Sequence, residues 1–135
     1  MGYTHYWNNG DFTDAQWRIL TMNAALLIKA SRICAGWDGD VHTEIEISNS
    51  VISFNGVGED AHETFALTRQ ASEFTFCKTA RKPYDAVVVA ILVSAALQAD
   101  HFEWSSDGDG EEGQLDAAQE LVQLAIINPH GDFQS

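Results

Sequence analysis

Residues 86–97 form an almost wholly apolar segment, which constrains the fold more than any other feature of the sequence. A helix that is apolar on every side has to be surrounded by the rest of the domain. The three valines at positions 87–89 favour a strand, because β-branched side chains lose freedom in a helix. The length of the segment and Pro83, which suits a first helical position, favour a central buried helix instead. Asp85 would then lie next to the positive end of the helix dipole.

Two further helices are expected, one on each side of this segment along the chain. Thr13 and Gln16 have the spacing of a capping box, and apolar residues recur after them at helical spacing. We therefore expect a helix over residues 14–34, with Gly36 as its stop. An amphipathic pattern predicts the last helix over residues 114–127.

Strand-forming segments surround these helices. Short turns such as Asn55-Gly56 separate the strands in the middle of the chain, which favours antiparallel pairing. Phe74 and Phe76 are expected to face the core. The order β-α-β-β-β-β-α-β-α predicts one α+β domain over residues 1–135, with a single mostly antiparallel sheet packed against three helices. The strands are expected over residues 1–7, 41–47, 51–54, 62–67, 73–77 and 101–105.

The chain is strongly acidic, with 20 acidic and 7 basic residues and a formal net charge of −13. Such a surface repels nucleic acid, so direct nucleic-acid binding is not expected. No apolar run reaches the ~20 residues that span a bilayer, and the first residues lack the features of a signal peptide. We expect a cytoplasmic protein with no membrane association, and a homo-oligomer stays open.

Metal and cofactor motifs are missing from the sequence. Cys34 and Cys77 have no zinc-site spacing, and we expect two reduced, mostly buried thiols. The acidic segment 105–112 does not match a calcium loop, since Glu112 and Ala118 stand where that loop needs glycine and glutamate. We therefore predict neither a bound metal nor a cofactor, and no nucleophile motif occurs.

The basic residues are concentrated just before the apolar helix. Four of the seven lie within residues 69–82, and Thr79 stands among them. A helix N-terminus offers N–H groups and a positive potential, so this segment predicts an anion site. The alternative is a solvated turn whose bases pair with the many acids of this protein. The candidate anion-binding residues are Arg69, Lys78, Thr79, Arg81 and Lys82.

The first strand is a second candidate site. Tyr3, His5 and Trp7 would share one face of it, and Tyr6 would lie on the other. Aromatic rings around a histidine could stack a planar ligand and offer a proton acceptor near neutral pH. The alternative is that one of these faces belongs to the core.

Glu63 is a third candidate, because it would share its strand face with the apolar Phe65 and Leu67. A carboxylate among core residues needs either a raised pKa or a cationic partner, which Arg69 or Arg81 could supply. The alternative is an acid on an edge strand that reaches solvent.

Several phrases of the sequence resemble a family of small uncharacterised proteins of bacteria and their phages that begin with MGYTHYW. These phrases cover about a fifth of the chain. The resemblance implies no activity; it implies that the phrases belong to one site, and a phage setting would favour a host-defence inhibitor. The phrases are residues 1–7 (MGYTHYW), 54–56 (FNG), 62–65 (HETF), 76–85 (FCKTARKPYD) and 105–108 (SSDG).

Three functions are compatible with these features. The first is binding of an anionic, nucleotide-like ligand by the basic segment and the aromatic residues of the first strand. The second is an acidic interaction protein that imitates DNA and occupies a basic host protein, such as a nuclease or a CRISPR effector. The third is a small enzyme with His5 or Glu63 as acid–base group and Arg81 as electrostatic stabiliser.

Overall fold

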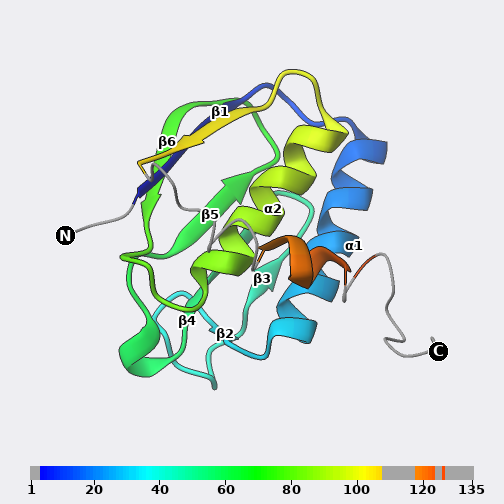
Figure 1. The fold of residues 1–135 in the computed structure, drawn as a ribbon. Helices are drawn as coiled ribbons and strands as arrows, with labels where there is room; N and C mark the ends of the chain where they lie inside the picture. The colour runs from blue at the N-terminus through cyan, green and yellow to red at the C-terminus, as the bar shows by residue number, and fades with distance from the viewer. Residues whose placement is uncertain (1–3, 108–117, 124–125, 127–135) are drawn as a thin grey trace.

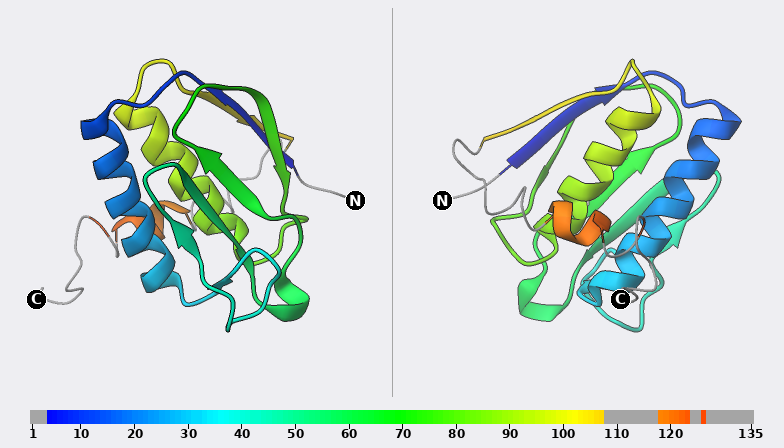
Figure 2. Two further views of the ribbon diagram at one scale, coloured as in Figure 1. Left: turned by 180° about the vertical axis from the view of Figure 1, so that it is seen from behind. Right: turned by 45° about the vertical axis from the view of Figure 1, so that its right-hand side comes forward.

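A computed structural model describes residues 4–107, 118–123 and 126 of the chain, and the fold is α+β (Figure 1). Two long helices, α1 (Asp14–Ser31) and α2 (Asp85–Gln98), lie side by side over one face of the strands (Figure 2). Residues 118–122 form a further short helix. It lies within the predicted last helix, residues 114–127, half of which fall outside the described residues.

The predicted capping box of α1 is confirmed. The Thr13 hydroxyl accepts the Gln16 N–H at 3.1 Å, and the Gln16 side chain accepts the Thr13 N–H at 2.9 Å. The helix ends earlier than predicted, because Arg32 adopts a left-handed conformation with φ 59° and donates its N–H to Ile28. Gly36 is therefore not the stop.

The prediction of a central buried helix is also confirmed for α2. Every residue from Val87 to Leu92 is buried, whereas Leu97 near its end is exposed. The helix begins at Asp85 rather than Pro83, because Pro83 and Tyr84 form a tight turn before it. No helix within the described residues is both long and apolar enough to cross a bilayer.

The strands form two antiparallel sheets, so the prediction of a single sheet is wrong. In the first, β1 (Thr4–Asn9) lies between β6 (Ser72–Lys78) and β7 (Glu103–Ser106). In the second, β4 (Val51–Gly56) pairs with β2 (Cys34–Ala35), β3 (Glu46–Ile47) and β5 (Phe65–Thr68). A short 3₁₀ turn, Gly58–Asp60, follows β4.

The two sheets divide between β5 and β6, although these strands are neighbours in the chain. Phe74 in β6 has a φ of 43°, and it lies where the β1–β6 ladder shifts its register, between the partners of Trp7 and Asn9. Backbone bonds still link the two sides, from the Glu63 N–H to the Lys78 carbonyl at 3.2 Å and from the Phe12 N–H to the Arg69 carbonyl at 3.1 Å.

Two local predictions in the second sheet are wrong. Only the end of the segment 41–47 is a strand, because the Asp38 and Asp40 side chains hold residues 40–43 in a turn. Asn55-Gly56 is not a turn but the end of β4. The buried Asn55 amide donates to the carbonyls of Trp37 and His62 at 3.1 and 3.0 Å.

The predicted register of β6 is wrong by one residue. Phe74 and Phe76 are 69% and 50% exposed, whereas Cys77 is fully buried opposite His5. A shift of one residue exchanges the two faces of a strand. This reversal leaves an aromatic surface on the side of the first sheet that faces away from α2.

Candidate functional site

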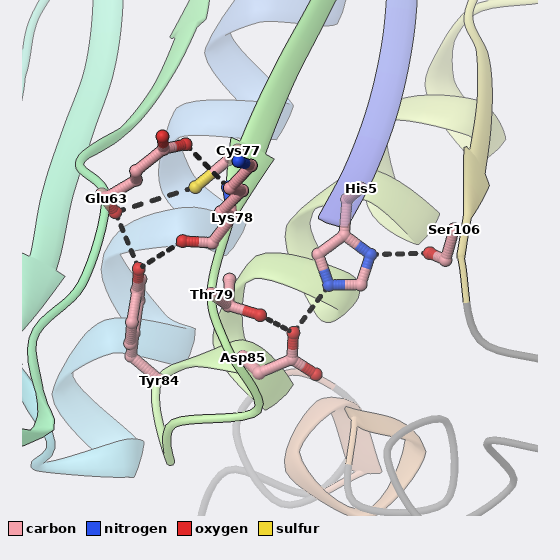
Figure 3. A network of polar contacts seen from close by, with 8 residues as sticks. All are labelled: His5, Glu63, Cys77, Lys78, Thr79, Tyr84, Asp85 and Ser106. Atoms are coloured by element: carbon pink, nitrogen blue, oxygen red, sulfur yellow. Dashed lines mark hydrogen bonds and ion pairs between the residues drawn. The ribbon is translucent and has the colours of Figure 1, made fainter. Parts of the chain in front are cut away.

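His5 is the centre of a buried polar network (Figure 3). It lies on β1, the middle strand of the first sheet, and its side chain is fully buried and points toward the start of α2. Its Nε2 atom is 2.5 Å from Oδ1 of Asp85, and its Nδ1 atom is 2.5 Å from Oγ of Ser106. One imidazole therefore connects a carboxylate to a hydroxyl. We call these three residues and Thr79 the His5 network.

The partners of Asp85 determine which nitrogen of His5 carries the proton. The Thr79 hydroxyl donates to Oδ1 of Asp85, the same oxygen that faces His5. An ionised carboxylate only accepts hydrogen bonds, so we assign the proton to Nε2 of His5. The Nδ1 atom then carries a lone pair and accepts the hydrogen bond of the Ser106 hydroxyl. This is the arrangement in which a histidine can remove a proton from a serine.

Strand pairing and the start of α2 bring these groups together. Ser106 on β7 and Cys77 on β6 are the partners of His5 in the two ladders of the sheet. Asp85 is the first residue of α2, where the helix dipole favours a negative charge. Its backbone N–H donates to the Lys82 carbonyl at 2.9 Å, so the carboxylate is held next to a closed turn.

A second set of contacts surrounds Glu63 on the other side of β6 (Figure 3). Its carboxylate accepts the Lys78 backbone N–H at 2.7 Å, and its carbonyl accepts the Tyr84 hydroxyl at 2.6 Å. The expected arginine partner is thus replaced by a backbone N–H group. These bonds fix the last residue of β6 and the residue before α2, and they brace the chain that carries Thr79 and Asp85.

Both thiols in the protein are unsuited to nucleophilic chemistry. Burial raises the pKa of Cys77 to about 12, and the nearby charge of Glu63 adds to this. Burial also raises the pKa of Cys34 to about 12. Both cysteines are free, as expected, and both are protonated at neutral pH.

The turn between β6 and α2 has an unusual backbone. Ala80 and Arg81 have positive φ angles of 52° and 60°, and the Lys82 N–H closes the turn on the Thr79 carbonyl at 2.9 Å. Left-handed backbone costs a residue other than glycine about 1–2 kcal/mol. Strained turns of this kind cluster at functional sites.

This turn carries three of the predicted anion-binding cations. Lys78 and Arg81 are exposed, and Lys82 is half-buried. Thr79 is fully buried and belongs to the His5 network. The first strand and the basic turn therefore meet, because Lys78 is the ladder partner of Thr4 and Thr79 shares Asp85 with His5.

Arg69 lies apart from the other cations. It precedes β6, whereas Lys78 is the last residue of that strand. Its guanidinium pairs with Asp14 and donates to Asn49 at 2.9 Å and to the Phe12 carbonyl at 3.3 Å. It lines an open groove of about 900 Å³ beside the start of α1, and its contacts join β5 to that helix.

Trp7 and Tyr6, the described aromatic residues of the first strand, do not stack on His5. Trp7 is buried in the core, with its ring 5.3 Å from that of Phe65. Tyr6 lies on the opposite face, where its hydroxyl donates to Asp107 at 3.0 Å, a bond that raises its pKa. Tyr3 lies outside the described residues. Among the described residues, Trp104 of β7 has its ring near His5, with the ring centroids 6.5 Å apart.

Sequence reasoning missed Asp85 and Ser106 as site residues. Asp85 was assigned only to the helix dipole, and Ser106 only to a polar segment. Residues 1–7, 76–85 and 105–108, which the sequence analysis singled out, include His5, Thr79, Asp85 and Ser106, and the structure joins these four residues in one network. Within the described residues, no three His, Cys, Asp or Glu side chains are grouped so that they could hold a metal ion.

Comparison of the chain with protein-family models found no match, and comparisons with curated proteins and with solved structures found none either. Function therefore has to be inferred from the residues and geometry of the chain itself.

Proposed function

We propose that the protein is a small hydrolase in which Ser106 is the nucleophile, His5 the general base and Asp85 the group that orients the histidine. One observation carries this proposal: both nitrogens of a fully buried imidazole are engaged, one by a carboxylate and the other by a serine hydroxyl. Nucleophile, base and orienting acid define this class of catalyst by geometry, whatever their order in the chain.

The burial of each group suits this division of roles. His5 and Asp85 are fully buried, so their interaction is not weakened by water. Ser106 is only partly buried and lies at the accessible end of the chain of hydrogen bonds. A purely structural role explains the network less well, because burying a carboxylate and an imidazole carries a desolvation cost that apolar residues of similar volume avoid.

The basic turn indicates the class of substrate. Lys78, Arg81 and Lys82 supply positive charge next to Thr79, which shares the Asp85 carboxylate with His5. In a protein of net charge −13, a local cluster of cations would attract an anionic substrate to this end of the first sheet. We therefore propose an ester that carries a carboxylate or phosphate group.

The reaction follows from the assigned proton positions. The Ser106 oxygen attacks the acyl carbon and its proton passes to Nδ1 of His5, while Asp85 stabilises the resulting imidazolium. The bond to the leaving alcohol breaks, and His5 returns the proton to that alcohol. A water molecule then attacks the acyl-serine with His5 again as base, which releases the acid and restores the serine.

Labelling with a fluorophosphonate tests the nucleophile. We expect the native protein to be labelled at Ser106, and Ser106→Ala to abolish labelling and ester hydrolysis. Ser105→Ala is the matched control, because Ser105 is the neighbouring serine on the same strand and pairs with Tyr6 on the opposite face. If the two variants behave alike toward both the probe and an anionic ester, Ser106 is not the nucleophile.

The substrate class is tested separately with a charged and a neutral ester of the same acyl group. Lys78→Ala and Arg81→Ala should raise KM for the anionic ester and leave the neutral ester unaffected. Equal effects on both esters would exclude charge recognition by the turn.

Binding of an anionic, nucleotide-like ligand without chemistry is the second candidate function. The left-handed Ala80 and Arg81 favour it, because strain in a basic turn is typical of ligand-binding loops. A thermal-shift screen against nucleotides, with Arg81→Ala as the comparison, tests this candidate. A shift that Ser106→Ala leaves intact while no ester is hydrolysed would support binding alone.

The acidic DNA-mimic hypothesis depends on residues 107–112, of which the described part of the chain includes only Asp107. It stays a prediction, as does inhibition of a host defence. Charge reversal within residues 107–112 should weaken salt-sensitive binding to a basic nuclease if the hypothesis is correct.

A further inference from the structure

The first sheet carries exposed aromatic rings on the face opposite the His5 network. His5 and Trp7 on β1 point inward, so the alternate residues Tyr6 and Asn8 point outward. Tyr6 is paired with Phe76 on β6 and with Ser105 on β7. This face plays no part in the proposed hydrolysis and needs a separate explanation.

Phe74 lies on this face with a strained backbone conformation. Its φ of 43° lies in the left-handed region, which is a clear outlier for a bulky residue. Its ring stacks on Tyr6 with centroids 5.7 Å apart and an interplanar angle of 22°. The Tyr6 hydroxyl is fixed in turn by Asp107. The strained residue thus carries an aromatic ring that is 69% exposed, so burial of this ring in the core does not offset the backbone strain.

A cavity of about 300 Å³ lies against this pair of rings, and the Glu103 residue of β7 lines it with them. Asn8 and Ser105 also line the cavity. An aromatic face next to a carboxylate is the combination that binds organic cations, because the ring quadrupole and the negative charge act in the same direction.

Charge on this face also favours a cation. Glu103 and Asp107 are both exposed, and Asp107 is bonded to the Tyr6 hydroxyl. Among the described residues, Lys78 also lies on this face, at the end of β6 where it pairs with Thr4. The net charge of −13 adds a long-range attraction for positively charged partners.

We propose that this cavity binds an arginine side chain of a basic peptide or protein. The planar guanidinium stacks on the exposed face of Phe74 and donates hydrogen bonds to the Glu103 carboxylate. Arginine fits these two contacts better than lysine, because it combines stacking with a fork of donors that matches a carboxylate. The site is independent of the proposed hydrolase activity.

Calorimetric titration of the full chain with a short acetylated and amidated peptide that contains two arginines tests the proposal. The same peptide with citrulline keeps the shape of the side chain and removes its charge. We expect binding of the arginine peptide and loss of binding with citrulline. Equal binding of both peptides would overturn the proposal, and equally tight binding of a lysine peptide would overturn the assignment to a guanidinium.

Variants on two strands locate the site. Phe74→Leu keeps an apolar side chain without a ring, and Glu103→Gln removes the charge on β7; each should weaken binding about fivefold. Phe76→Leu is the matched control, because Phe76 is exposed on the same strand but does not line the cavity. Unchanged binding by Glu103→Gln, or an equal loss with Phe76→Leu, would refute the site even if Phe74→Leu altered the strand.

Discussion

Replacing Asp85 with asparagine tests the His5 network through the stability of the protein as well as through its chemistry. The substitution keeps the size of the side chain and removes its charge. Asp85 receives hydrogen bonds from His5 and Thr79 and lies at the start of α2, all without exposure to solvent. Each of these interactions depends on the negative charge, so all are weakened together.

The expected loss can be worked from these contacts. A hydrogen bond to a charged group contributes about 1.5–3 kcal/mol and one to a neutral group about 0.5–1.5 kcal/mol, a difference of about 1 kcal/mol for each of the two bonds. Loss of the charge at the helix N-terminus adds about 0.3–1 kcal/mol. Asp85→Asn should therefore lower the free energy of unfolding by about 3 kcal/mol, which a domain of typical stability, about 5–15 kcal/mol, survives.

Urea unfolding followed by circular dichroism measures this loss, with Asp100→Asn as the matched control. Asp100 is exposed just beyond the other end of α2, so its neutralisation should change the free energy of unfolding by less than about 0.5 kcal/mol. Fluorophosphonate labelling of the folded variant reports on the chemistry, since asparagine favours the histidine tautomer that cannot accept the Ser106 proton. If both variants unfold at the same urea concentration, Asp85 does not anchor the network and the reasoning fails.

Three further predictions concern the fold. Urea unfolding should show that Ile91→Ala, in the buried part of α2, lowers the free energy of unfolding by about 2–5 kcal/mol. Leu97→Ala on the same helix is the control, because this side chain is 80% exposed and its removal should lower the free energy of unfolding by less than about 0.5 kcal/mol. Gly56→Ala should destabilise the protein by about 1–3 kcal/mol by the same measurement, because its Cβ would overlap the backbone carbonyl of Asp60. The pKa of the Cys77 thiol is raised from 9.0 to about 12, so this group should stabilise the fold fully below pH 9 and progressively less between pH 9 and 12. The urea midpoint of the native protein should therefore fall more steeply over that pH range than the urea midpoint of Cys77→Ser.

The parts of the fold that could be predicted from the sequence depend on local interactions. The capping box of α1 joins residues three positions apart, and the burial of α2 follows from its own composition. The end of α1 could not be predicted in the same way, because Arg32 rather than a glycine adopts the left-handed conformation. The division into two sheets depends on which distant strands pair, and a single sequence leaves that pairing open.

The candidate site could be predicted only in part, because its contacts join distant residues. His5 was identified as a candidate acid–base group, but its partners Asp85 and Ser106 are 80 and 101 positions away in the chain. Pairing of this kind is decided by strand register, which a single sequence leaves open. The basic turn could be predicted because its residues are neighbours in the chain: Lys78, Thr79, Arg81 and Lys82. Arg69 is also near in sequence, but its contacts hold it at the start of α1.

Two departures from the expected polarity pattern fall on the first sheet, and this bears on function. Its middle strand buries His5, and the neighbouring β6 turns Phe74 and Phe76 to solvent. Both choices cost stability relative to the reverse pattern, since a buried polar side chain must be matched by partners and an exposed aromatic ring gives up burial. Sequences break local rules mainly where function requires it. The two faces of this one sheet, with the hydroxyl–imidazole–carboxylate chain on one side and the aromatic cavity on the other, are therefore where substitution should alter activity and binding rather than only the stability of the fold.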